Sequence, residues 1–341
     1  MSKVLVTGGT GFVAGWCIVK LLAAGHEVRT TVRRESSIAD VRATVAAGGQ
    51  AADGLDFAVV DLTADAGWAE AMAGCDYVLH VASPMNPDKA GDADAYIRPA
   101  REGVLRVLRT AAAAGVKRVV MTSSCAACNP DRKGETFTDE TVWTDPASVE
   151  HAWYRLSKVL AERAAWEFME AEGGAMELVT ILPAAIFGPA LGNSARSSLL
   201  VIDNLLFGKP PGVPKVGMCV TDVRDLADMH VAAMTVPDAA GERFIIAGDF
   251  LWMKEIADVL RKRLGAEAAA APKRQIPDFL VRISARTNPN LHNLLPMLGR
   301  KNRYDSGKAQ RVLGYRPTDA ADVVADTGRS LVHIRRLAAE A

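Results

Sequence analysis

Tyr154 and Lys158, four residues apart, are the side chains in this sequence best suited to proton transfer. On a helix, residues at this spacing lie on one face, one turn apart. The neighbouring apolar residues form a different stripe, so core packing does not require the polar pair. A lysine ammonium next to a tyrosine favours the phenolate and is expected to lower the usual tyrosine pKa of about 10. Because such pairs also arise by chance, the interpretation needs a second feature.

That second feature is an apolar run, residues 119–121, that ends in the hydroxyls of Thr122, Ser123 and Ser124. In an open α/β sheet, ligands bind at the carboxyl ends of the strands, so Ser124 is expected to face the ligand crevice. Ser124 would hold a carbonyl oxygen, and Tyr154 would give or take its proton. Lys158 would tune Tyr154 and bind the nicotinamide ribose. The alternative is that the hydroxyls only satisfy backbone groups of a turn.

A glycine-rich turn near the start of the chain predicts a dinucleotide site. Residues 3–6 are typical of a strand, and Phe12 opens an apolar helical pattern. The free N–H groups at a helix start attract a pyrophosphate where no side chain blocks the approach, and Gly8 and Gly11 leave that space. Ala14 stands where a third glycine is usual and is small enough for close packing. A simple strand-to-helix joint is the alternative.

The end of the second expected strand predicts the coenzyme. An acid there usually holds the ribose of NAD, whereas an arginine accepts the 2′-phosphate of NADP. This sequence has Arg33 and Arg34 and no acid before Glu35, which favours NADP over two merely solvated arginines. Asp61, after the third strand, is expected either to contact the adenine or to cap a turn.

Composition and charge exclude several classes of protein. Forty basic and forty acidic residues cancel, which gives no reason to expect nucleic acid or an anionic membrane as partner. The longest uncharged stretch, 178–195, is interrupted by proline and glycine, and the N-terminus does not resemble a signal peptide, so we expect a cytoplasmic protein, monomeric or homodimeric. Five cysteines in apolar segments indicate reduced core thiols, and Cys125 and Cys128 have no second pair, so no metal site is expected.

Strand and helix patterns alternate through the first half, which predicts an α/β Rossmann fold, a doubly wound parallel sheet, with a smaller, mostly helical C-terminal substrate lobe. We expect the NADP-binding domain over 1–183, with later segments returning near 216–247, and the substrate lobe mainly over 184–341. Strands are expected at 3–6, 27–32, 56–60, 77–80, 118–122, 177–182 and 243–247, and helices near 12–24, 38–47, 67–72, 94–114, 149–172, 195–207, 222–235, 252–264 and 319–338.

The sequence resembles the extended short-chain dehydrogenase/reductase family over nearly its whole length, and within it the branch of dihydroflavonol 4-reductase and cinnamoyl-CoA reductase. The resemblance lies in Val-Thr-Gly-Gly-Thr-Gly-Phe-Val at 6–13, Thr-Ser-Ser at 122–124, Tyr-Arg-Leu-Ser-Lys-Val-Leu-Ala-Glu at 154–162 and Asp-Val-Arg-Asp-Leu-Ala at 222–227. It implies that Ser124, Tyr154 and Lys158 form the catalytic triad. His80 is expected to be a core or turn histidine.

The resemblance also implies a set of coenzyme contacts. Asn129 matches a position that faces the substrate in the plant enzymes, and apolar Met85, Phe187 and Met218 are further substrate candidates. The lysine that often follows the arginine is replaced here by residues such as Ser36, and the Cys125 segment is unusual, so flavonoid substrates are not implied. The expected coenzyme residues are Gly8, Thr10, Gly11, Phe12, Val13, Arg33, Arg34, Asp61, Leu62, Val81, Ala82, Ser83, Thr122, Tyr154, Lys158, Pro183, Ala184, Ala185, Ile186 and Ser198.

The sequence therefore predicts an NADPH-dependent reductase of aldehydes or ketones that carry aromatic or bulky apolar groups. Two alternatives use the same triad: an NAD-dependent 3β-hydroxysteroid dehydrogenase type and a nucleotide-sugar epimerase or dehydratase. A non-catalytic NADP-binding sensor is a third, although such proteins tend to lose the tyrosine or the lysine and both are present here.

Overall fold

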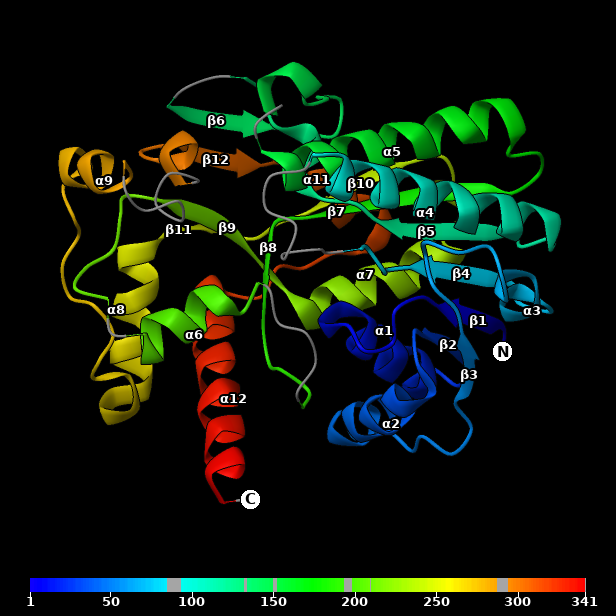
Figure 1. Ribbon diagram of the computed structural model, residues 1–341, viewed down its shortest axis with the longest axis horizontal. Coiled ribbons are helices and arrows are strands. Elements are labelled where there is room, and N and C mark those ends of the chain that lie inside the picture. Colours follow the sequence, from blue (N-terminus) through cyan, green and yellow to red (C-terminus); the bar gives the residue numbers. More distant parts are fainter. Residues whose placement is uncertain are drawn as a thin grey trace.

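The computed structural model describes residues 1–84, 93–131, 134–149, 152–192, 198–208, 210–286 and 294–340. At its centre is a parallel sheet of seven strands in the order β3-β2-β1-β4-β5-β7-β10 (Figure 1). The strand order reverses between β1 and β4, and a crevice at the carboxyl ends of the strands is typical of such a reversal. The strands are β1 (Lys3–Val6), β2 (Glu27–Val32), β3 (Asp56–Val59), β4 (Tyr77–His80), β5 (Arg118–Thr122), β7 (Glu177–Pro183) and β10 (Arg243–Ile246).

Helices cover both faces of this sheet because its strands are apolar on both sides. Val4 and Val6 of β1 pack into one apolar cluster and Leu5 into another, as the alternation of side chains along a strand requires. The first cluster is completed by α1 (Phe12–Ala23), α2 (Ile38–Ala47), α7 (Val223–Thr235) and α11 (Gly307–Leu313), and the second by α3 (Trp68–Met72), α4 (Asp94–Ala113) and α5 (Trp153–Glu172).

A second lobe, on the left in Figure 1, is built mainly from the C-terminal half of the chain. Its helices α6, α8 and α12 pack around a core that includes Phe187. The lobe is mostly helical but also holds two small sheets that the sequence patterns did not predict, since four of their five strands have only three or four residues, too few for a recognisable alternation. The elements are α6 (Leu200–Phe207), α8 (Met253–Leu264), α9 (Asp278–Ser284), α12 (Ala320–Glu340), the sheet β8 (Ala185–Phe187), β9 (Gly217–Asp222) and β11 (Phe250–Trp252), and the pair β6 (Glu135–Thr138) and β12 (Lys301–Tyr304).

The doubly wound fold is as predicted, and all seven expected strands are present with ends within one residue. The helix expected over 149–172 begins at Trp153, because residues 146–149 form a separate 3-10 turn and Ala152 has a non-helical backbone. The helix expected over 195–207 begins at Leu200, and residues 193–197 lie outside the described part. Of the later segments, α7, β10 and also α11 join the Rossmann layers, whereas β9 belongs to the second lobe.

The five cysteines are buried and unpaired, in agreement with core thiols. Cys125 donates to the Leu182 carbonyl at 3.2 Å and Cys128 to that of Cys125 at 3.4 Å, so both serve the local packing. Across the described ranges, His, Cys, Asp and Glu do not gather in groups of three or more that could hold a metal ion. None of the helices in these ranges is both long and apolar enough to cross a bilayer.

Candidate active site

The glycine-rich turn between β1 and α1 is shaped by close contacts. Gly8 has φ +75°, a left-handed conformation, and a Cβ atom there would come within 2.9 Å of the Ala82 Cβ. The N–H groups of Gly8 and Gly9 donate to the Thr31 hydroxyl at 2.8 Å and the Thr31 carbonyl at 2.9 Å. The turn is therefore fastened to β2 on one side and lies against the end of β4 on the other, with no space for side chains between them.

The first turn of α1 suits an anion such as a pyrophosphate. Gly11 is the N-cap residue, and no side chain caps the helix. The first N–H groups of any α-helix lack acceptors within the helix, so those of Phe12 and Val13 are available to a ligand. A Cβ on Gly11 would lie 3.1 Å from the Gly8 carbonyl, so a side chain there would crowd this approach. The local structure fits a dinucleotide, as the sequence predicts.

Arg33 and Arg34 follow β2 and are exposed. Asp61, at the end of β3, accepts from the N–H and the hydroxyl of Thr63, both at 2.7 Å. These two bonds, with the nearby charge of Arg33, lower the pKa of the Asp61 carboxyl. Asp61 thus caps a turn, the alternative considered from the sequence, and one of its carboxylate oxygens carries both of these bonds.

The carboxyl end of β4 is held by a buried histidine. His80 Nδ1 and the Thr7 hydroxyl form a hydrogen bond of 3.0 Å, and Thr7 accepts from the Ala82 N–H at 2.9 Å. Burial, assisted by the charge of Lys158, lowers the pKa of His80 to about 3, so its ring is neutral near neutral pH. His80 is a core histidine, as expected, and it joins the ends of β1 and β4.

Two hydroxyls at the end of β5 have different environments. Thr122 bonds to His230 Nε2 at 2.7 Å, and His230 Nδ1 bonds to the Leu226 carbonyl at 2.8 Å. Since a carbonyl only accepts, Nδ1 carries the proton and the Thr122 hydroxyl donates to Nε2. Ser124 accepts from the Ala126 N–H at 3.1 Å and caps the short 3-10 helix η2 (Cys125–Cys128). That bond uses a lone pair of Ser124 and leaves its O–H proton available.

Tyr154 and Lys158 lie on the first turns of α5. The Lys158 Nζ is 5.9 Å from the centre of the Tyr154 ring, and 45% of Tyr154 is exposed. Burial lowers the pKa of Lys158 to about 8, while the charge of Glu162 acts in the opposite direction. Burial raises the pKa of the Tyr154 phenol, contrary to the lowering that we expected from a neighbouring ammonium. Although 45% of the residue is exposed, desolvation of the phenol causes this shift.

Packing brings these elements to one side of the sheet. Leu156 and Val159 of α5 contact Ala127 of η2, which places the start of α5 against the segment that Ser124 begins. Lys158 lines a small cavity together with residues from the ends of β3, β4 and β5. The other residues of this cavity are Leu62, His80, Ala82, Ser83, Pro84, Ala100, Val104, Met121, Thr122 and Ala161. Leu62, Ala82, Ser83, Thr122 and Lys158, five residues predicted to contact the coenzyme, therefore meet around one space.

The other expected coenzyme residues flank this space or lie near the second lobe. Thr10 is exposed at the tip of the turn, and Val81 follows β4. Pro183 ends β7 in the core, and the Ala184 N–H donates to the Thr221 hydroxyl at 3.1 Å. Ala185 and Ile186 are half-buried in β8, and Ser198 is half-buried before α6.

The substrate candidates are mostly not supported by the structure. Phe187 has no exposed surface and belongs to the core of the second lobe, so its expected contact with substrate is wrong. The Asn129 Oδ1 accepts from Tyr304 at 2.8 Å and Asn302 at 3.4 Å, which favours a structural role. Met218 is half-buried against the lobe core. Met85 lies outside the described residues.

Sequence reasoning missed a buried charge pair behind the catalytic helix. Glu162 is fully buried and accepts from Arg243 Nε at 2.9 Å and from the Ser123 hydroxyl at 2.6 Å. Spacing offers a signal for Glu162, since it follows Lys158 by four residues and Tyr154 by eight. Nothing local marks Arg243, which comes from a strand 81 residues later in the chain.

The chain is similar to known reductases and to a large enzyme family. The model of the NAD dependent epimerase/dehydratase family matches residues 4–247. Over 263 residues, 76% of each protein, the chain is 35% identical to cinnamoyl-CoA reductase 1 of Petunia hybrida. It is 33% identical to dihydroflavonol 4-reductase of Zea mays over 271 residues, 77% of this chain and 74% of that enzyme.

The fold is shared with solved structures. The crystal structure of the yeast methylglyoxal/isovaleraldehyde reductase Gre2 complexed with NADPH superposes with a TM-score of 0.79, covering 99% of this chain and all of that one, at 24% identity. At this identity the likeness concerns the fold, and it extends through both lobes.

Proposed function

This chain belongs to the NAD dependent epimerase/dehydratase family, and within it we propose an NADPH-dependent reductase of aldehydes or ketones that carry aromatic or bulky apolar groups. It is an oxidoreductase of the carbonyl-reducing branch, with NADP as coenzyme. The preference for NADPH over NADH rests on the exposed Arg33 after β2, whereas the reductase chemistry rests on one observation above all. The Lys158 ammonium, on the same helix face as Tyr154, lines a cavity formed by the ends of β4 and β5, next to the glycine-rich turn.

The residues that would hold the coenzyme follow from their positions. The start of α1 would take the pyrophosphate, with Gly8 and Gly11 leaving it room. The exposed Arg33 would take the 2′-phosphate, since a guanidinium matches phosphate oxygens well. Lys158 would reach the nicotinamide ribose from the small cavity. The bound coenzyme supplies the hydride.

Side chains of α5 and of the segment after β5 would bind and protonate the carbonyl oxygen. In reduction, negative charge develops on that oxygen, and donors already aimed at it stabilise the transition state. Ser124 still has its hydroxyl proton to donate, because in its bond to the Ala126 N–H it is the acceptor. Tyr154 would give the proton that completes the alcohol. With a pKa raised above the ordinary tyrosine value of 10, the phenol is protonated near neutral pH, which is the form that a proton donor needs.

A panel of carbonyl compounds, followed through the absorbance of NADPH, tests this proposal. We expect turnover of aromatic or bulky aldehydes and ketones, and a higher kcat/KM with NADPH than with NADH. Equal rates with the two coenzymes would contradict the NADPH preference. Conversion of a sugar nucleotide without net oxidation of NADPH, and no reduction of any carbonyl in the panel, would favour an epimerase instead.

A further inference from the structure

Glu162 has no solvent exposure and lies one helical turn beyond Lys158. Its carboxylate accepts four hydrogen bonds: from Ser123 Oγ at 2.6 Å, Thr180 Oγ1 at 2.8 Å, Arg243 Nε at 2.9 Å and Arg243 Nη2 at 3.4 Å. These donors come from the end of β5, the middle of β7 and the start of β10. One side chain thus connects α5 to three strands of the central sheet.

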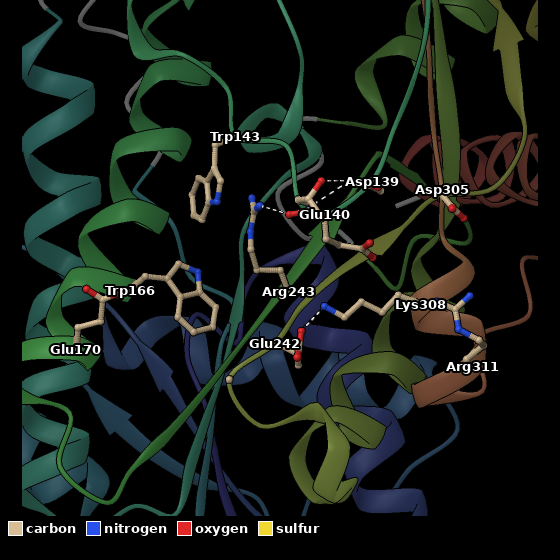
Figure 2. Close-up of a pocket in the computed structure, with 12 residues that line it drawn as sticks. Asp139, Glu140, Trp143, Trp166, Glu170, Glu242, Arg243, Asp305, Lys308 and Arg311 are labelled. Atoms are coloured by element: carbon tan, nitrogen blue, oxygen red, sulfur yellow. Dashed lines mark hydrogen bonds and ion pairs between the residues drawn. The ribbon is translucent and has the colours of Figure 1, made fainter.

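Arg243 is itself fixed from the far side. Its guanidinium lies 3.6 Å from the centre of the Trp143 ring and donates to the carbonyls of Glu140 and Val142. Figure 2 shows Arg243 next to Trp143 and Glu140 on the wall of a cavity of about 540 Å³, which Trp166 and Glu242 also line. The cavity gives small solutes a route to the guanidinium side of the ion pair.

Burying two charges to fix a helix costs desolvation free energy. Breaking a buried ion pair is strongly destabilising, but apolar side chains of similar volume would often pack as well or better. Stability alone therefore does not explain why Glu162 and Arg243 form a buried ion pair at this position. Its location offers one, because Ser123 directly precedes Ser124 and Glu162 follows Lys158 on the same helix.

We propose that Glu162 is a positioning residue of the reductase: held by Ser123, Thr180 and Arg243, it sets α5 against β5 so that Tyr154 and Lys158 meet Ser124, and it places a negative charge one turn from Lys158. The part of this inference that concerns catalysis rests on the proposed function. The effect of Glu162 on Lys158 does not depend on which substrate is reduced.

The charges that face Lys158 come from few elements. On α5 the charged group is Glu162, while the Tyr154 phenol is neutral near neutral pH, and His80 of β4 is neutral above its lowered pKa of about 3. The other described residues that line the cavity at Lys158 carry no charge. Burial lowers the pKa of Lys158 to about 8, and Glu162 opposes this. Removing the negative charge is expected to lower the pKa of Lys158 further, so its ammonium is lost at a lower pH.

The first test compares Glu162→Gln with Glu167→Gln, which removes an exposed charge from the same helix. The ε-carbon signal of Lys158 is titrated by NMR in coenzyme-free protein labelled with ¹³C-lysine, and is assigned with Lys158→Met. We expect a lower titration midpoint for Glu162→Gln and the wild-type midpoint for Glu167→Gln. In turnover with NADPH, Glu162→Gln should lower kcat by roughly 10- to 100-fold with little change in the KM for NADPH, since small misplacement of reacting groups costs rates of this order.

A second test uses the cavity in Figure 2. Arg243→Ala leaves Glu162 without its cation, and guanidinium chloride at low, non-denaturing concentration can enter beside Trp143 to replace it. We expect guanidinium to restore part of the lost kcat of Arg243→Ala, whereas sodium chloride of equal ionic strength does not. The double variant with Glu162→Gln should not respond. Should Glu162→Gln fail to fold, Arg243→Ala and its rescue decide the matter.

The proposal is wrong if folded Glu162→Gln keeps both the wild-type midpoint of Lys158 and the wild-type kcat, or if guanidinium does not revive Arg243→Ala. Failure of the proposed function looks different. Wild-type protein would then reduce no carbonyl compound with NADPH, while the NMR titration of Lys158 would still report whether Glu162 acts on it.

Discussion

The Lys158 Nζ lies 5.9 Å from the centre of the Tyr154 ring, on the same face of α5, while burial raises the pKa of the phenol. The phenol is therefore protonated near neutral pH, as a tyrosine with the ordinary pKa of about 10 would also be. Tyr154→Phe should lower kcat by roughly 10²- to 10⁴-fold, the usual contribution of a proton donor, and should leave NADPH binding unchanged. Initial rates and NADPH fluorescence titrations test this. Tyr77→Phe, on β4, is the control, and unchanged turnover in Tyr154→Phe would contradict the assigned role.

Lys158 is expected to set the dependence of activity on pH. Burial lowers its pKa from 10.5 to about 8, so the ammonium form declines as the pH rises through that value. If reduction needs the ammonium, kcat/KM, which reports the groups of the free enzyme, should fall above about pH 8. Profiles of kcat/KM against pH for wild-type protein and Lys158→Met measure this. A wild-type kcat/KM that stays constant well above this pH would show that catalysis does not need the Lys158 ammonium.

Gly8 and Gly25 have nearly the same backbone but different surroundings. Their φ values are +75° and +77°, yet a Cβ at Gly8 meets Ala82 at 2.9 Å while nothing lies within 4 Å of one at Gly25. Alanine in this conformation costs roughly 1–2 kcal/mol at either position. Gly8→Ala should lose more thermal stability than Gly25→Ala and should also bind NADPH more weakly. Equal melting temperatures and equal NADPH affinities of the two variants would show that Ala82 does not exclude a side chain at position 8.

Arg33 should distinguish NADPH from NADH. Hydrogen bonds to charged groups contribute about 1.5–3 kcal/mol, which corresponds to roughly 10- to 100-fold in affinity. Arg33→Ala should therefore raise the KM for NADPH by about that factor and leave the KM for NADH unchanged. Arg101→Ala, an exposed arginine on α4, is the matched control. A parallel change for both coenzymes would mean that Arg33 does not contact the 2′-phosphate.

Two buried histidines should make the protein sensitive to acid. Burial lowers the pKa of His230 to about 4 and that of His80 to about 3, both from 6.5, so the unfolded chain takes up protons first as the pH falls. Stability is therefore complete above pH 6.5 and declines towards pH 4. Between pH 7 and 5 each histidine should cost about 2 kcal/mol of unfolding free energy.

Urea unfolding at these two pH values measures the loss. His230→Gln should be less stable at pH 7, because the bond to Thr122 changes, but should show a smaller decrease on acidification. The same decrease in the variant as in wild-type protein would contradict the assignment to His230.

Local sequence pattern was sufficient to predict the fold and to identify the residues that could take part in catalysis or coenzyme binding. The sheet strands are apolar on both faces and separated by amphipathic helices, and such periodicity is a property of neighbouring residues, so β1 to β5 could be located closely. Tyr154 and Lys158 could be paired because a helix sets their spacing, and Gly8 could be singled out because a glycine before a helix leaves room for a pyrophosphate. The short strands of the second lobe lack such local periodicity.

Tertiary structure decided what surrounds each of these residues. Phe187 is apolar, which suits a substrate contact and a core equally, and only the packing of the second lobe buried it. The pKa of Tyr154 depends on desolvation by elements distant in sequence, so a neighbouring lysine could not reveal its direction. Glu162 meets Arg243 across 81 residues because β10 returns beside β7. Sequence determines which groups are present and how near neighbours are spaced, whereas burial and long-range pairing exist only after the chain has folded.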